Sequence, residues 1–251
     1  MPKNTSALSA IPAAGARRGL PTSASLRYFY GPMDCGKSTL ALQINYNHSR
    51  QGRHGLLLTQ NDRSAAPLIS SRMGMDRAAI DISADLDPRR VVRDRWAHGE
   101  RVDYLIVDEA QFLQAEQVDQ LAELVDVSDV DVYAFGLLTD FRSALFPGSQ
   151  RLLELADEIT KLQGEVLCWC GRIGAFNGRV VDGRLVKVGA QVMVADTAPG
   201  QAWDVDGSRQ DSDIRYQVLC RRHWRIADLG PGSSEAQAAL QISAQDVPDS
   251  F

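Results

Sequence analysis

The sequence lacks long hydrophobic runs. No apolar stretch in its 251 residues approaches the roughly 18 residues that a membrane-spanning helix needs, which excludes that class of protein. The N-terminal stretch also lacks the apolar core of a signal peptide, so we expect a cytoplasmic protein without a membrane partner. The net charge is −5 and no basic stripe interleaved with aromatic residues is present, which argues against nucleic acid as a partner.

Cysteine is scarce, and the sequence has no internal repeat. Four cysteines in a chain without an export signal favour thiol or metal chemistry over disulfide bonds. The 44% of hydrophobic and 24% of charged residues are typical of a globular protein. This length suits one hydrophobic core with a small appended module.

Both ends have the composition of tails. Residues 1–25 contain no acidic residue and are rich in Ala, Ser, Pro and Gly, which predicts a disordered segment. A transit peptide is the alternative, because such segments also carry arginine and serine and avoid acidic residues. Residues 229–251 predict a second disordered tail.

Between the tails, short apolar runs alternate with helical patterns. Continuous apolar runs of this length are typical of strands buried on both faces of a parallel sheet. The pattern predicts an α/β P-loop domain over residues 26–165, a parallel sheet with helices on both faces. After about residue 165 the sequence becomes rich in Gly, Val and Arg, which predicts a second, loop-rich module over 166–228. The expected strands are 26–30, 56–59, 104–107 and 132–138, and the expected helices are 38–50, 111–125 and 149–157.

Residues 31–38, Gly-Pro-Met-Asp-Cys-Gly-Lys-Ser, match the phosphate-loop pattern G-x-x-x-x-G-K-[ST] in full. We expect Gly31 and Gly36 to adopt backbone angles that a side chain would forbid, so that successive N–H groups surround phosphate oxygens. Lys37 is placed to reach the β- and γ-phosphates, and the Ser38 hydroxyl can ligate Mg²⁺. The motif predicts that the chain binds a nucleoside triphosphate with magnesium.

Two carboxylates follow the apolar run 104–107. Asp108 has the position of a residue that holds Mg²⁺, and Glu109 that of a base which accepts a proton from the attacking group. The alternative is that both cap a helix starting near Gln111, where negative charge is favourable. If the base activates water the protein is an NTPase, and if it activates a substrate hydroxyl the protein is a kinase.

Cysteine and histidine form two short pairs some fifty residues apart, Cys168-x-Cys170 and Cys220-x-x-His223. Three thiolates and one imidazole form a common tetrahedral zinc site, so these residues predict structural zinc. The first pair is one residue tighter than the usual spacing. The alternative is that they are small buried residues which happen to cluster.

These motifs, in this order, resemble one family, the type II thymidine kinases. The likeness covers about residues 26–228 and lies in residues 31–39, in Asp108-Glu-Ala-Gln-Phe112 and in Gly136-Leu-Leu-Thr-Asp-Phe-Arg142 followed by Phe146-Pro-Gly. It implies phosphoryl transfer from ATP to the 5′-hydroxyl of thymidine, giving dTMP in deoxynucleoside salvage. Acceptance of deoxyuridine stays open. The resemblance further implies a zinc-anchored lasso, inhibition by dTTP and a homotetramer.

The resemblance also assigns site residues, with Glu109 as the base for the thymidine hydroxyl. The implied ATP side comprises Gly31, Pro32, Met33, Asp34, Cys35, Gly36, Lys37, Ser38, Thr39, Arg63, Asp108 and Gln111. The implied thymidine side comprises Met33, Asn61, Leu137, Phe141, Phe146, Arg179 and Tyr216. Aromatic side chains can sandwich a pyrimidine, but core packing is an alternative for Phe141 and Phe146, and a solvated loop arginine is an alternative for Arg63.

Three positions depart from the family pattern. Leu138 stands where the family usually has Asp, Asn61 where it commonly has an acidic residue beside the ribose, and the Cys168-x-Cys170 pair is short. These departures concern sugar preference and efficiency and not the reaction type, because Asn61 can still hydrogen-bond a hydroxyl. Two other functions remain as alternatives: a nucleic-acid-stimulated ATPase with a zinc module, and a regulatory protein that binds nucleosides without phosphorylating them.

Overall fold

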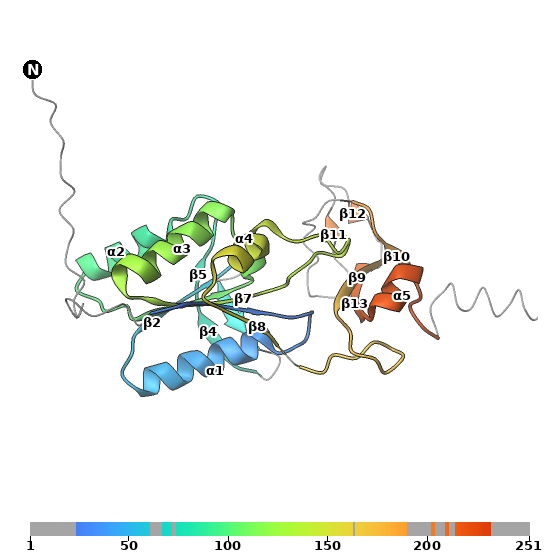
Figure 1. Ribbon diagram of the computed structural model, residues 1–251, viewed down its shortest axis with the longest axis horizontal. Coiled ribbons are helices and arrows are strands. Elements are labelled where there is room, and N and C mark those ends of the chain that lie inside the picture. The colour runs from blue at the N-terminus through green and yellow to red at the C-terminus, as the bar shows by residue number, and fades with distance from the viewer. Residues whose placement is uncertain are drawn as a thin grey trace, which may run out of the picture.

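The computed structural model describes residues 24–60, 67–71, 74–162, 164–189, 202–203, 209–210 and 214–231 (Figure 1). The expected tails therefore lie almost wholly outside the described residues, as do Asn61 and Arg63. The division into domains at residue 165 stays a prediction.

A six-stranded parallel sheet forms the centre of the larger part of the molecule, which confirms the expected α/β class. One of its two central strands, β6 (Tyr104–Asp108), is buried along its whole length, as the continuous apolar run 104–107 predicted. The expected strand over 132–138 ends two residues earlier, at Gly136. In spatial order the strands are β5 (Ile80–Asp81), β2 (Gly55–Thr59), β6 (Tyr104–Asp108), β7 (Asp131–Gly136), β1 (Leu26–Tyr30) and β8 (Glu158–Lys161).

Helices cover both faces of this sheet, as expected (Figure 1). On one face, α2 (Pro88–Ala97), α3 (Ala115–Ser128) and α4 (Pro147–Leu155) enclose the larger apolar core. On the other face, α1 (Lys37–Arg50) and the hairpin of β3 (Leu68–Ser70) and β4 (Asp76–Ala78) enclose a smaller core. None of the helices in the described part of the chain has both the length and the apolar character needed to cross a membrane.

The helix expected over 111–125 is divided in two. A short 3₁₀ turn, η1 (Ala110–Phe112), ends at Leu113, and α3 begins only at Ala115. Gln114 causes this division, because its extended backbone begins a new helix and its N–H donates to Oε1 of Gln117 at 3.0 Å, one half of a capping box. The separate turn places Glu109 immediately before η1 and Gln111 within it, directly after the carboxyl end of β6.

A smaller module lies beyond the carboxyl ends of β1 and β7 (Figure 1). It contains an antiparallel sheet in the order β10 (Arg184–Val186), β9 (Phe176–Val181), β13 (Ile214–Leu219), and the short helix α5 (Arg221–Ile226). Two further short strands, β11 (Ala202–Trp203) and β12 (Arg209–Gln210), pair with each other. Within the described part of this module, a buried apolar cluster comprises Cys168, Val180, Leu219, Cys220 and Leu229.

Candidate active site and metal centre

The phosphate loop connects β1 to α1, and the two glycines of its motif differ in backbone conformation and in surroundings. Gly36 has φ +85° and precedes the first residue of α1, in the left-handed region that favours glycine. Gly31 does not have a positive φ, so the expectation that it relieves backbone strain is wrong. A Cβ atom there would lie 2.5 Å from Sγ of Cys35, so the Cys35 side chain would have to shift to admit one.

Lys37 is buried at the mouth of this loop. Its Nζ donates to the carbonyl oxygen of Pro32 at 2.8 Å and lies 3.4 Å from that of Gly31. Lys37 is the first residue of the 14-residue helix α1, and its ammonium group lies over the loop that precedes the helix. The helix N-terminus and the loop N–H groups also favour an anion there. This arrangement suits a bound phosphate chain.

The two carboxylates predicted at the end of β6 lie beside the loop. Oδ2 of Asp108 accepts a hydrogen bond from Oγ of Ser38 at 2.7 Å, and Oδ1 accepts from the backbone N–H of Glu109 at 3.0 Å. Burial, reinforced by the negative charge of Glu109, raises the pKa of Asp108 to about 6. Asp108 and Ser38 thus present oxygen atoms together, which is the donor set that Mg²⁺ prefers.

Glu109 is fixed by a neighbour whose role the sequence did not indicate. Its backbone has φ +55°, which is uncommon for a residue with a side chain and turns the chain sharply after β6. Gln111 is buried, donates from Nε2 to Oε2 of Glu109, and accepts at Oε1 from the N–H of Leu137 at 2.9 Å. A Cβ at Gly136 would lie 2.7 Å from that amide oxygen, so glycine makes room for it. Gln111 therefore orients the carboxylate from the end of β7.

Of the aromatic rings predicted on the thymidine side, Phe141 and Phe146 are buried and Tyr216 is partly buried. Phe146 packs edge-on against Phe112 with ring centroids 5.6 Å apart, and Phe141 carries the guanidinium of Arg179 over its face at 3.8 Å. Tyr216 is the register partner of Arg179 between β13 and β9, and burial raises the pKa of its hydroxyl. The structure thus brings four of the predicted residues into two adjacent clusters.

Arg179 has unused hydrogen-bonding capacity. Arg179 is only 3% exposed, and within the part of the chain that the structure describes its Nε and Nη1 have no hydrogen-bond partner. Its Nη2 makes one long contact of 3.5 Å with the carbonyl oxygen of Val188. Buried guanidinium donors without acceptors are costly. This arginine is therefore suited to an acceptor supplied by a ligand.

Two contacts between the sheet region and the smaller module were not predicted from the sequence. The backbone N–H of Met33 donates to Oδ1 of Asn177 at 2.9 Å, although 144 positions separate them, and Asn177 is 5% exposed. Trp224 on α5 donates from Nε1 to the carbonyl oxygen of Phe141 at 3.1 Å. No local pattern distinguishes Asn177 or Trp224, so only the three-dimensional fold identifies them.

Leu137 and Leu138 lie at the end of β7. The carbonyl oxygen of Leu137 accepts from Oγ of Ser149 at 2.5 Å and from the hydroxyl of Tyr28 at 3.2 Å. Leu138 packs against the larger apolar core, which explains an apolar residue at this departure from the family pattern. Asn61 and Arg63 lie outside the described residues, so their predicted roles stay predictions.

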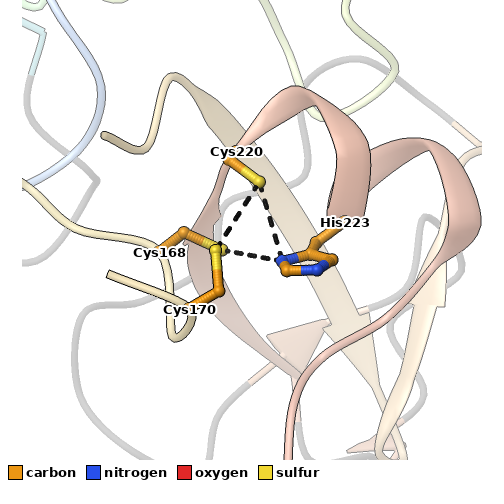
Figure 2. Close-up of side chains that lie close together, drawn as sticks. All are labelled: Cys168, Cys170, Cys220 and His223. Atoms are coloured by element: carbon orange, nitrogen blue, oxygen red, sulfur yellow. Dashed lines mark hydrogen bonds between the residues drawn. The ribbon is translucent and has the colours of Figure 1, made fainter. Parts of the chain in front are cut away.

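The four predicted metal ligands converge (Figure 2). Their ligand atoms all lie within 4.8 Å of one another, with Nδ1 of His223 at 3.4 Å from Sγ of Cys168 and 3.6 Å from Sγ of Cys220. Zn–S distances of about 2.3 Å and Zn–N distances of about 2.0–2.1 Å place tetrahedral ligand atoms about 3.5–3.8 Å apart. The cluster therefore fits zinc.

The surroundings of the cluster explain its short spacing. Gly171, with φ +79°, donates its N–H to the carbonyl oxygen of Cys168 at 2.9 Å, and this tight turn brings Cys170 back toward Cys220. On the other side, Oδ2 of Asp228 lies 3.9 Å from Nε2 of His223, the nitrogen that does not face the thiols. A carboxylate there orients a metal-binding imidazole.

Comparison with known proteins gives one consistent result. The family model described as thymidine kinase matches residues 24–197. A thymidine kinase from Streptomyces avermitilis is 50% identical over 200 residues, 80% of this chain and 88% of that protein. A thymidine kinase from Streptomyces coelicolor is 52% identical, also over 80% of this chain and 88% of that protein. One from Cutibacterium acnes is 48% identical over 82% of this chain and 91% of that protein.

Proposed function

The chain belongs to the thymidine kinase family, and from this premise we propose how its own residues carry out the transfer. It phosphorylates thymidine with ATP as the phosphoryl donor. The observation that carries the proposal is the hydrogen bond from Ser38 of the phosphate loop to Asp108, with Glu109 next in the chain and its carboxylate held by Gln111. The alternative of a nucleic-acid-stimulated ATPase is not favoured.

ATP occupies the phosphate loop. Backbone N–H groups of residues 31–38 and the ammonium group of Lys37 bind its phosphate oxygens, and Thr39 at the start of α1 completes this side of the site. Ser38 and Asp108 would hold Mg²⁺, which supplies charge neutralisation for the β- and γ-phosphates. The remaining predicted ATP residues in the described part of the chain, Asp34, Cys35 and Gln111, contribute backbone or orienting contacts.

Glu109 is the general base. Its carboxylate accepts the proton of the thymidine 5′-hydroxyl while the hydroxyl oxygen forms a bond to the γ-phosphorus, and the bond from that phosphorus to the β–γ bridging oxygen breaks to release ADP. Gln111 supports this role because its amide fixes one oxygen of Glu109. Lys37 stabilises the charge that develops on the transferred group.

Thymidine lies between the end of β7 and the smaller module. Phe141, Phe146 and Tyr216 provide apolar and aromatic surfaces for the base, and Met33 and Leu137 extend this wall. The two buried donors of Arg179 without partners supply hydrogen bonds to an acceptor of the bound substrates. Asn61 contributes to the ribose side and Arg63 to the phosphate side.

The module over residues 166–228 acts as a lasso over the substrate. Cys168, Cys170, Cys220 and His223 bind structural zinc, which ties the two ends of the lasso together and contributes stability to it. Closure excludes water and so favours transfer over hydrolysis. The family membership further supports a cytoplasmic homotetramer that dTTP inhibits in deoxynucleoside salvage.

ADP release from ATP and Mg²⁺, measured with and without thymidine and with single-stranded DNA as a control, tests the proposal. We expect release that depends on thymidine and yields dTMP. Release that is indifferent to thymidine and rises with DNA would mean that Glu109 activates water, and would overturn the assignment.

A further inference from the structure

A basic cavity of about 940 Å³ lies between the end of β8 and the metal-binding module. Five basic side chains line it. Lys161 is the last residue of β8, Arg172 lies in the turn after Cys170, and Arg221, Arg222 and Arg225 lie on α5. None of the residues that line the cavity is acidic. Apart from Cys220, none belongs to the predicted ATP, thymidine or metal sites.

These five basic side chains have no electrostatic partner among the described residues. Arginines elsewhere, such as Arg53 and Arg151, pair with carboxylates at 2.6 Å. The cavity cations, by contrast, form no ion pair in the part of the chain that the structure describes, and all five are exposed. Five like charges around one hollow repel one another, and this repulsion is relieved when a polyanion enters. This concentration is notable in a chain whose net charge is −5.

The chemistry of the lining favours phosphate groups on a small molecule. Four of the five cations are arginines, whose planar forks bind phosphate in a bidentate manner. The volume lies within the range of about 300–1,000 Å³ typical of small-ligand pockets. Each terminal phosphate carries about −1.5 to −2 charges, so roughly two to three phosphate groups balance the cavity.

Single-stranded nucleic acid fits the cavity less well. Such strands bind along a track of aromatic side chains on which successive bases stack. The aromatic ring in the lining is Phe176, and it already stacks on Trp224 with ring centroids 5.2 Å apart. Ile173 and Ile226, 66% and 61% exposed, instead provide aliphatic contacts at the rim.

We propose that this cavity is a second anion site, which binds the polyphosphate group of a small phosphorylated ligand independently of the phosphate loop. The ligand would bridge both parts of the molecule. Lys161 belongs to the large sheet, and the next residue, Leu162, donates its N–H to the carbonyl oxygen of Tyr30 immediately before the phosphate loop. The arginines belong to the metal-binding module, so an occupant would fix that module relative to the loop.

Calorimetric binding of inorganic tripolyphosphate to the zinc-loaded full chain tests the proposal. Lys37→Ala serves as the background, because it weakens binding at the phosphate loop. We expect one tripolyphosphate to bind in this background, and the further changes Arg172→Gln and Arg225→Gln to weaken it at least 10-fold. Arg90→Gln with Arg93→Gln on the exposed face of α2 is the matched control and should leave it unchanged.

Further arms identify the source of the phosphate. Competition of tripolyphosphate by GTP would indicate a nucleotide, and absence of competition would indicate inorganic polyphosphate; both outcomes support the site. Three results would overturn it: no binding in the Lys37→Ala background, equal weakening by the control pair, or binding of a single-stranded oligonucleotide without tripolyphosphate binding. None of these measurements requires turnover, so a negative result would refute the second anion site without bearing on the thymidine kinase assignment.

Discussion

The sheet region and the metal-binding module differ in how each is held together. Eighteen buried residues form the larger core of the sheet region, and a second core lies on the opposite face. Among the described residues of the module, five form a buried apolar cluster, and two of them, Cys168 and Cys220, are themselves candidate metal ligands. The described core of the module buries much less apolar surface than the cores of the sheet region, so a cross-link such as a bound metal would add to its stability. The sheet region is therefore held together mainly by burial, whereas the module adds to its small described core a cluster of four side chains that could hold a metal ion.

The same division separates reaction chemistry from substrate enclosure. The groups assigned to phosphate binding and proton transfer lie on β6, α1 and the loop before it, held by hydrogen bonds such as that from Ser38 to Asp108. In the proposed mechanism the module contributes residues that cover this site; of these, Asn177 contacts the phosphate loop at Met33 and Arg179 lies over Phe141. A substitution that impairs proton transfer in the sheet region should therefore leave thymidine binding measurable, and a substitution in the module should leave nucleotide binding measurable.

The largest expected effect is that of Glu109→Gln. Removal of the base should lower kcat by about 10²- to 10⁴-fold, since general-base catalysis contributes that much, while thymidine binding stays within about 3-fold. Steady-state ADP release and calorimetric thymidine binding measure the two quantities. Glu116→Gln, an exposed carboxylate at the start of α3, is the control. Retention of turnover in Glu109→Gln would refute the assigned role.

Loss of a metal ligand should impair the use of thymidine and leave nucleotide binding at the phosphate loop intact. We expect Cys220→Ser to weaken zinc binding more than about 100-fold and to raise the KM for thymidine, while ADP binding to the loop persists, because removing an outer-shell group alone costs about 10- to 100-fold. Asp228→Asn should give that smaller loss, since the carboxylate lies 3.9 Å from His223. Chelator competition and steady-state kinetics measure both. Unchanged zinc affinity in Cys220→Ser would contradict the metal assignment.

The sequence predicted the sheet region better than the module. Apolar runs such as 104–107 identify buried strands because burial on both faces requires apolar residues at consecutive positions. The phosphate loop and the two carboxylates are contiguous motifs, so their mutual geometry follows from the strands that carry them. The single misjudged glycine, Gly31, shows the limit, since its space requirement comes from the fold of the loop around Cys35.

Contacts between the two regions could not be predicted, because they join residues far apart in the chain. Asn177 and Met33 meet only through the placement of β9 beside the phosphate loop. Gln111 was assigned to the ATP side by resemblance, but its orienting contacts with Glu109 and Leu137 depend on the turn after β6. The four metal ligands were predictable in identity, and their convergence needed the turn at Gly171.

A smaller effect concerns the pH dependence of stability in the sheet region. Folding raises the pKa of Asp108 from 3.8 to about 6, so the folded protein binds this proton more tightly than the unfolded chain does. The contribution of Asp108 to the free energy of unfolding therefore falls as the pH rises from about 4 to 6. Without nucleotide and Mg²⁺, Asp108→Asn should therefore be more stable than the parent at pH 7.5, on the order of 2 kcal/mol, and the gain should shrink at pH 5. Denaturant unfolding at both pH values measures this. Asp126→Asn, on the exposed side of α3, should show no such trend.

The smallest effect that we predict joins the two regions. Asn177→Ala removes the acceptor for the N–H of Met33, a residue of the phosphate loop, although Asn177 lies in the lasso. Loss of a buried hydrogen bond costs about 1 kcal/mol, so ADP binding should weaken roughly 5-fold, with zinc content unchanged. Asn47→Ala, which removes an exposed amide contact with Gln43 on α1, is the control and should leave ADP binding as it was. If ADP affinity is the same in Asn177→Ala, the lasso does not support the loop through this contact, and the two regions are more independent than their hydrogen bond indicates.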